Sequence, residues 1–142
     1  RSDVIRKRLL GREPTERLPE SAYTSEVSQR VFRAIEARAG ALLRAGHSVI
    51  ADAVYGHPGQ RAGIEAVAKG AGATFAGIWL TAAEAELERR VDLRQDDASD
   101  ADARVVRLQR GIDEAAVAWH RLRADRPLAA IADEARRLIG AG

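Results

Sequence analysis

The chain has 142 residues, of which 46% are hydrophobic, 4% aromatic and 31% charged. This length suits one domain, and its core must be aliphatic because aromatic side chains are scarce. A formal net charge of +2, with basic and acidic residues alternating, is weak support for a nucleic-acid partner, and the absence of cysteine excludes disulfides and cysteine-ligated zinc. No signal peptide or long apolar run supports secretion or membrane spanning, so we expect a cytoplasmic protein.

Two helices are predicted in the first 46 residues. Residues 3–10 have the pattern of an amphipathic helix, and a loop with two prolines follows over residues 11–23. A long helix then begins at Thr24 or Ser25 and is ended by Gly46. The apolar stripe expected to be buried on this helix consists of Val27, Val31, Ile35, Leu42 and Leu43.

The hydrophobic period changes after the second helix. Residues 48–51 are a short apolar run that ends at Asp52, which predicts a buried strand. A helix should follow to about Ala71, and residues 74–80 predict the second strand. The elements expected after it are a helix over about 82–94 with Thr81 and Glu84 as its capping box, a polar break over 95–102, a helix over about 100–111, a strand over 119–124 and a last helix capped by Asp125 that ends at Gly140.

The order of these elements predicts the fold class. Strand and helix alternate, which favours an α/β fold with parallel strands joined by right-handed crossovers. The strands are few for so many helices, and the chain contains no Met. We therefore expect a fragment whose first strand lies upstream. No internal repeat or linker is found, and a single domain over residues 1–142 is expected.

Asp52 is the clearest single candidate for chemistry. A carboxylate after an apolar strand lies where parallel sheets bind their ligands, and it can hold Mg²⁺ beside a nucleotide phosphate. The alternative is an ordinary strand-end aspartate that bonds loop amides. Arg61, on the following helix, could face the same cleft.

Asp3 and Arg6 lie three residues apart on the opening helix and share a face. An acid beside a guanidinium could deprotonate an acceptor hydroxyl and clamp a transferring phosphate. The alternative is that Asp3 is favoured by the helix dipole and pairs with Lys7, four residues along.

Arg90 and Arg94 are spaced four residues apart, just before the polar break. Arginines beside a polar flap suit phosphoryl transfer, in which negative charge spreads over the phosphate oxygens. The alternative is a set of surface ion pairs with Glu86 and Glu88. No Gly-Lys-Ser/Thr triplet occurs in the sequence, and the glycine-rich residues 70–74 precede a strand, so the chain has no phosphate-binding loop.

Three segments, RSDVIRKRLLG, VIADAVYGHPGQR and LERRVDLRQDDASDAD, together resemble the P-loop kinase-like ATP-binding domains of the AAA_33 and zeta-toxin-like group. Such domains are often fused to aminoglycoside-phosphotransferase-like domains. The resemblance covers nearly the whole chain. It implies a three-layer P-loop kinase-like parallel sheet lacking its first strand and phosphate loop, with ATP and Mg²⁺ as cofactors of the intact parent.

The resemblance also implies an activity, which is transfer of a phosphoryl group from ATP to a hydroxyl of a small molecule or a polynucleotide end. The implied roles are catalysis by Asp3, Arg90 and Arg94, acceptor binding by Arg6 and Arg61, Mg²⁺ binding by Asp52, and cofactor contacts from Asp97, Ser99 and Asp125, with a lid over about 95–103. Asp3, Asp52, Arg61 and Arg94 should then converge on one cleft.

We expect the parent to be a kinase and this chain alone to be inactive. Acceptor specificity is expected in residues 11–23. Two other interpretations stay open: a non-catalytic P-loop-fold regulatory or interaction fragment, and an arginine-rich nucleic-acid-binding domain, whose affinity would fall steeply with salt.

Overall fold

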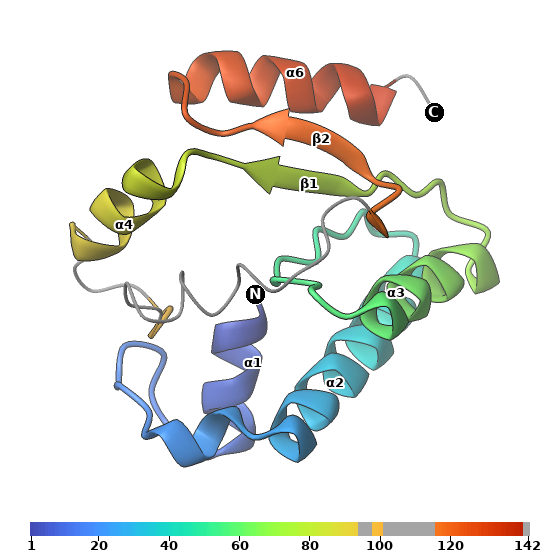
Figure 1. Ribbon diagram of the computed structural model, residues 1–142. Helices are drawn as coiled ribbons and strands as arrows, with labels where there is room; N and C mark the ends of the chain where they lie inside the picture. The colour runs from blue at the N-terminus through green and yellow to red at the C-terminus, as the bar shows by residue number, and fades with distance from the viewer. Residues whose placement is uncertain (94–97, 101–115, 141–142) are drawn as a thin grey trace. The chain divides into compact units, whose positions relative to one another are not determined.

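The computed structural model describes residues 1–93, 98–100 and 116–140 (Figure 1). It contains both helices and strands and falls into two compact units. The first unit consists of Arg1–Ala73 with Arg94–Asp100, and the second of Thr74–Leu93 with Ala101–Gly142. Each unit is described by itself. Among the described helices, none has the length and apolar character needed to span a membrane.

The regular structure described in the first unit is helical. Its elements are α1 (Ser2–Leu9), the 3₁₀ helix η1 (Glu20–Tyr23), α2 (Ser25–Arg44) and α3 (Pro58–Gly70). Helix α2 packs against both α1 and α3. The expected stripe on α2 is confirmed for Val31 and Ile35, which are buried, but it is wrong for Leu42, which is 38% exposed. The burial continues along the i+4 row to Ala39 instead.

Local signals set the ends of α2 as predicted. The Oγ1 atom of Thr24 accepts a hydrogen bond from the backbone N–H of Val27 at 3.3 Å, which satisfies one of the free amides of the first turn. At the other end, Gly46 has a φ of +83°, and its N–H donates to the Leu43 carbonyl. A residue without a Cβ adopts this left-handed conformation at little cost. Both predicted ends are confirmed.

The predicted buried strand over residues 48–51 is wrong. The segment forms no strand, and the Ile50 side chain is 91% exposed. An apolar run favours burial, but a strand also needs a partner for its backbone hydrogen bonds, and no described strand runs beside this segment. The backbone at its end is nevertheless held, because the Ser2 N–H donates to the Asp52 carbonyl at 2.8 Å.

The second unit contains two parallel strands. Strand β1 (Ile78–Thr81) pairs with β2 (His120–Arg123), with Leu80 opposite Leu122. The predicted strands are thus confirmed in shorter form, and the parallel direction is as expected. Helices α4 (Glu84–Asp92) and α6 (Leu128–Gly140) complete the unit, and α6 packs on β2 (Figure 1). Among the described residues of this unit, the buried side chains are Trp79, Val117, Leu122 and Ala124.

The two helix starts predicted in this unit are wrong by a few residues. Thr81 belongs to β1, and Ala83 instead accepts the first helical hydrogen bonds of α4, from Glu86 and Leu87. The carboxylate of Asp125 is bonded to the Arg123 guanidinium and does not cap α6. Pairing with β2 extends the strand to Thr81, a neighbouring guanidinium binds the Asp125 carboxylate, and a capping pattern shows neither. The helix expected over about 100–111 lies outside the described residues, apart from Asp100.

Candidate functional site

Seven side chains meet around α1 in the first unit. We call them the α1 cluster: Arg1, Asp3, Arg6, Lys7, Tyr23, Asp52 and Asp100. They come from α1 and the residue before it, from η1, from the segment before α3 and from residues 98–100. The cluster contains the predicted base, one predicted acceptor contact and the predicted metal ligand.

Asp3 lies half-buried in the first turn of α1. Burial raises its pKa above the usual 3.8, the positive charges of Arg6 and Arg1 oppose this rise, and the carboxylates of Asp100 and Asp52 add to it. Within the described ranges, its carboxylate makes no hydrogen bond or ion pair. The pairing of Asp3 with Lys7, considered above as an alternative, does not occur. Asp3 therefore keeps its oxygens available for another proton donor.

Arg6 is 7% exposed and has few polar partners for a buried guanidinium. Its Nη1 donates to the Ala22 carbonyl at 2.9 Å, while the Ser28 hydroxyl is 3.4 Å from both terminal nitrogens. The guanidinium carbon lies 4.7 Å from the centre of the Tyr23 ring. Burial lowers the Arg6 pKa, against the opposing charges around it. Its buried Nε–H has no hydrogen-bond partner in the described part of the chain, which leaves one donor unused.

Asp52 is the exposed member of the cluster. Its Oδ2 lies 3.3 Å from the Nε of Arg1, and its side chain is 63% exposed. The described ranges contain no group of three acidic or histidine side chains that could enclose a metal ion. Mg²⁺ beside a nucleotide, however, commonly takes one or two carboxylates and completes its shell with phosphates and water. A single exposed carboxylate such as Asp52 fits that requirement.

The guanidinium of Arg61 points into its own loop. It is 7% exposed, and its Nη1 donates to the carbonyls of Tyr55 at 2.8 Å and Gly56 at 3.2 Å. Tyr55 has a φ of +48°, which is uncommon for a residue with a side chain. What the structure shows for Arg61 is a clamp on the turn that follows Asp52, and its acceptor-binding role stays a prediction.

Asp100 has a larger structural role than the sequence predicts, since the sequence predicts it only as part of the lid over about 95–103. Its Oδ1 accepts from Lys7 Nζ at 3.1 Å, and its Oδ2 accepts from the Leu18 N–H at 3.1 Å and the Tyr23 hydroxyl at 2.5 Å. The side chains of Lys7 and Asp100 are 1% and 9% exposed. The sequence contains one weak indication of this pair, which is that Lys7 is a lysine in an arginine-rich chain. Its partner Asp100 lies 93 residues away, so no local pattern connects the two.

The hydrogen bonds of Asp100 predict an acid-dependent loss of stability. Burial would raise its pKa, but the bonds from Tyr23, Lys7 and the Leu18 amide outweigh burial and lower the pKa below 3.8. Its contribution is therefore complete above the unfolded value and is lost as the pH falls through the folded one. In urea titrations from pH 6 to pH 2, the wild type should lose more unfolding free energy than Asp100→Asn. Parallel pH profiles of the two proteins would contradict this assignment.

The two site candidates of the second unit are engaged in ion pairs. Arg90 donates to Glu86 through Nε at 2.6 Å and to the Ala124 carbonyl through Nη2 at 2.6 Å. Bonds from Arg89 and Arg90 lower the Glu86 pKa to about 2. Asp125 pairs with Arg123 at 2.7 Å. The pair of Arg90 with Glu86 is one of the surface pairs considered above, whereas the pair of Asp125 with Arg123 was not expected. The roles of Arg90 and Asp125 stay predictions.

Three further candidates lie in or beside the expected lid. Arg94 and Asp97 fall outside the described residues, so the expected convergence of Arg94 with the other site residues stays a prediction. Ser99 is described and directly precedes Asp100. Its cofactor role is likewise still a prediction.

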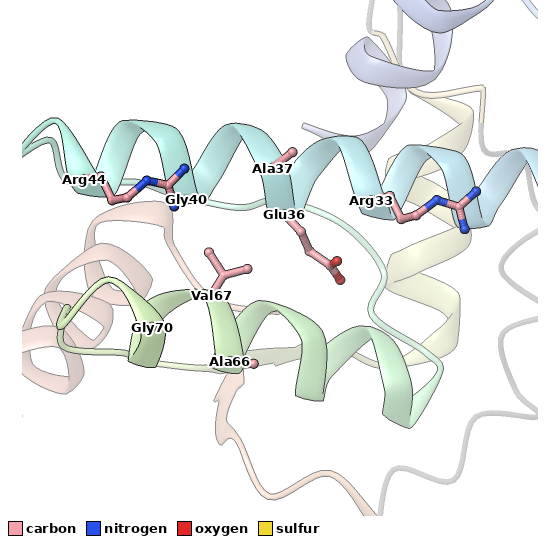
Figure 2. A pocket seen from close by; sticks show the side chains of 8 residues that line it. All are labelled: Arg33, Glu36, Ala37, Gly40, Arg44, Ala66, Val67 and Gly70. Atoms are coloured by element: carbon pink, nitrogen blue, oxygen red, sulfur yellow. The ribbon is translucent and has the colours of Figure 1, made fainter.

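An open hollow of about 510 Å³ lies between α2 and α3 (Figure 2). Glu36 points from α2 toward α3, and Val67 points back toward α2. The lining residues are Arg33, Glu36, Ala37, Gly40, Arg44, Ala66, Val67 and Gly70. None of the predicted site residues lines this hollow, which is therefore distinct from the α1 cluster.

The α1 cluster and the arginines of α4 can be compared with known families. The AAA_33 family model, described as an AAA domain, matches residues 1–114. The chain belongs to the AAA_33 family. The family resemblance predicted from the three segments is thereby confirmed. AAA_33 domains are nucleotide-binding and have a P-loop NTPase-like fold. No curated protein and no solved structure matches this chain.

The AAA_33 assignment bears on what the α1 cluster could hold. The 142 residues contain no Gly-Lys-Ser/Thr triplet, so they do not supply the loop that cradles nucleotide phosphates in this fold. They do supply an available carboxylate, an unused guanidinium N–H and an exposed carboxylate close together. The cluster thus fits the part of a nucleotide site that would bind the phosphoryl acceptor and the metal ion.

Proposed function

We propose that this AAA_33 domain transfers the terminal phosphoryl group of ATP to a hydroxyl of a small molecule or a polynucleotide end. The observation that carries the proposal is the state of Asp3: a half-buried carboxylate with no hydrogen-bond donor among the described residues, close to the Arg6 and Arg1 charges. A half-buried carboxylate with a purely structural role would be expected to have a donor.

Asp3 would act as the general base. Its oxygen takes the proton of the acceptor hydroxyl as that hydroxyl oxygen forms a bond to the γ-phosphorus, and the bond from that phosphorus to the bridging oxygen breaks to release ADP. A pKa raised by burial brings the base nearer to working pH, where general base catalysis is most efficient. The remainder of the catalysis is positioning and charge neutralisation.

Arg6 and Asp52 would deal with the negative charge beside this base. The guanidinium of Arg6 lies within range of Asp3, so its positive charge favours the negative charge that develops on the acceptor and phosphoryl oxygens. Asp52 would hold Mg²⁺ through its exposed carboxylate. When bound, that ion neutralises phosphate charge.

On the nucleotide side, the proposal keeps Arg90 and Arg94 as clamps, with Asp97, Ser99 and Asp125 as contacts. Arg90 is half-exposed in its pair with Glu86. Exposed ion pairs contribute only about 0–1 kcal/mol, so exchanging Glu86 for a phosphate would cost little. Arg61 supports the proposal through its hold on the turn after Asp52.

The test is the substitution Asp3→Asn in the natural protein that carries these residues. Transfer of label from γ-labelled ATP to water and to a panel of hydroxyl compounds should fall about 10²- to 10⁴-fold, the usual contribution of a general base. Affinity for Mg-ATP should be unchanged. The surface variant Asp133→Asn, which alters an exposed pair with Arg136, is the matched control.

Stability separates this loss from unfolding. Because the folded pKa of Asp3 lies above its unfolded value, its ionisation costs stability once the pH rises through 3.8. Asp3→Asn should therefore melt no lower than the wild type at pH 7 by circular dichroism. A wild type with turnover that Asp3→Asn leaves unchanged would sink the proposal.

A further inference from the structure

Asp100 connects several parts of the α1 cluster. It receives donors from three separate places: Lys7 on α1, the backbone of Leu18 in the preceding loop, and Tyr23 at the end of η1. Both carboxylate oxygens are engaged and the side chain is 9% exposed, so the group has one orientation. Neither the family assignment nor the proposed roles give this residue a task.

The bond to Tyr23 connects Asp100 with Arg6. The Tyr23 hydroxyl donates to Asp100 at 2.5 Å, and the face of the same ring lies 4.7 Å from the Arg6 guanidinium carbon. A tyrosine side chain has two rotatable bonds. A hydroxyl held at one end fixes the direction of the ring axis, and the preference of the O–H bond for the ring plane limits rotation about that axis. The ring then restricts where the guanidinium can lie.

Arg6 has little else to hold it. Its one short hydrogen bond goes to the Ala22 carbonyl, one residue before Tyr23, and its contacts with Ser28 are long at 3.4 Å. The position of the Nε–H therefore depends on the end of η1, which in turn is attached to Asp100. Asp3 lies one helical turn before Arg6, within range of its charge.

We propose that Asp100 is a positioning residue for phosphoryl transfer: through Tyr23 it holds the Arg6 guanidinium beside Asp3. The inference rests on the proposed function, since positioning has meaning only if Arg6 acts on the reacting groups. A purely structural Lys7–Asp100 pair would not need the tyrosine hydroxyl. Tyr23→Phe thus separates the two roles, because it keeps the ion pair, the Leu18 bond and the ring.

The experiment follows the Arg6 Nε–H signal by ¹⁵N nuclear magnetic resonance, with Arg6→Lys to assign it. A buried Nε–H exchanges slowly and reports the position of the nearby ring. In Tyr23→Phe and Asp100→Asn the signal should shift and broaden, and ATP turnover should fall about 10- to 100-fold, as for misplacement of a reacting group by about 1 Å. In the control Asp133→Asn, the Arg6 Nε–H signal and the ATP turnover should both equal those of the wild type.

The outcomes are distinct. An Arg6 signal that is unchanged in Tyr23→Phe overturns the inference, as does a shifted signal with wild-type turnover. Should Asp100→Asn fail to fold, Tyr23→Phe decides alone. These measurements use the natural protein that carries these residues. If that wild-type protein shows no turnover in the same assay, the proposed function is refuted and the inference is refuted with it, so the wild type tells the two failures apart.

Discussion

Lys7→Met is expected to lower the free energy of unfolding by about 3–5 kcal/mol, the usual cost of removing one partner from a buried ion pair. The Lys7 and Asp100 side chains are 1% and 9% exposed, and Lys7 Nζ also donates to the Pro14 carbonyl at 3.0 Å. Methionine fills nearly the same volume, so the loss comes from the missing charge and donors. The Asp100 carboxylate would remain buried without a cation beside it.

Urea denaturation followed by circular dichroism at 222 nm measures this effect. The chain provides a matched control, because Lys69 is its other lysine and is exposed. Lys69→Met should change the unfolding free energy by less than about 0.5 kcal/mol, as surface substitutions do. The double variant Lys7→Met with Asp100→Asn should lose less than the sum of the single variants, because it leaves no uncompensated charge. Equal losses in Lys7→Met and Lys69→Met would show that the pair is not buried.

Gly77→Ala is expected to destabilise the second unit by about 1–3 kcal/mol, through overpacking. A Cβ at Gly77 would lie under 3.0 Å from three ring atoms of Trp119, which packs beside the start of the sheet and also contacts Phe75 at 5.7 Å between ring centres. The Gly77 carbonyl accepts the His120 N–H at 2.9 Å, so the backbone cannot withdraw without breaking a bond of the strand pair. The ring must move instead.

The same substitution at Gly140 is the control for Gly77→Ala. A Cβ at Gly140 meets no atom within 4 Å, and this residue ends a helix of the same unit. Gly140→Ala should therefore leave stability unchanged or slightly raised. Trp79 and Trp119 are the only tryptophans in the chain, so thermal melts followed by tryptophan emission report on this unit. If Gly77→Ala melted at the same temperature as Gly140→Ala, the close approach of Trp119 to Gly77 would be contradicted.

The sequence predicted those parts of the fold that depend on neighbours in the chain. Thr24 and Gly46 mark the ends of α2, because a hydroxyl beside free amides and a residue without a Cβ act within one turn. The two parallel strands were also predicted, because each is a short run of β-forming residues that can be recognised without its partner. The strand over 48–51 was not, because its existence depends on a partner that the described chain does not provide.

The roles of the candidate site residues stay predictions, but one expectation about their positions was correct for an incorrect reason. Asp3 and Asp52 were expected near each other as residues at one edge of a parallel sheet. They do lie near each other, but the contact is a backbone bond from Ser2 on α1 to the Asp52 carbonyl, with no sheet involved. Arg61 was expected to face a substrate, yet its guanidinium holds its own loop.

From the sequence alone came the helix boundaries of the first unit and the neighbouring positions of Asp3 and Arg6, because each depends on spacing within a few residues. The two strands were predicted from short runs of β-forming residues, and the AAA_33 membership from the resemblance of three segments along the chain. The tertiary structure alone decided that Lys7 pairs with Asp100 and that Asp3 has no donor among the described residues. The physical reason is that a buried charge takes the partner that packing brings within reach, and here packing joins residues 93 positions apart.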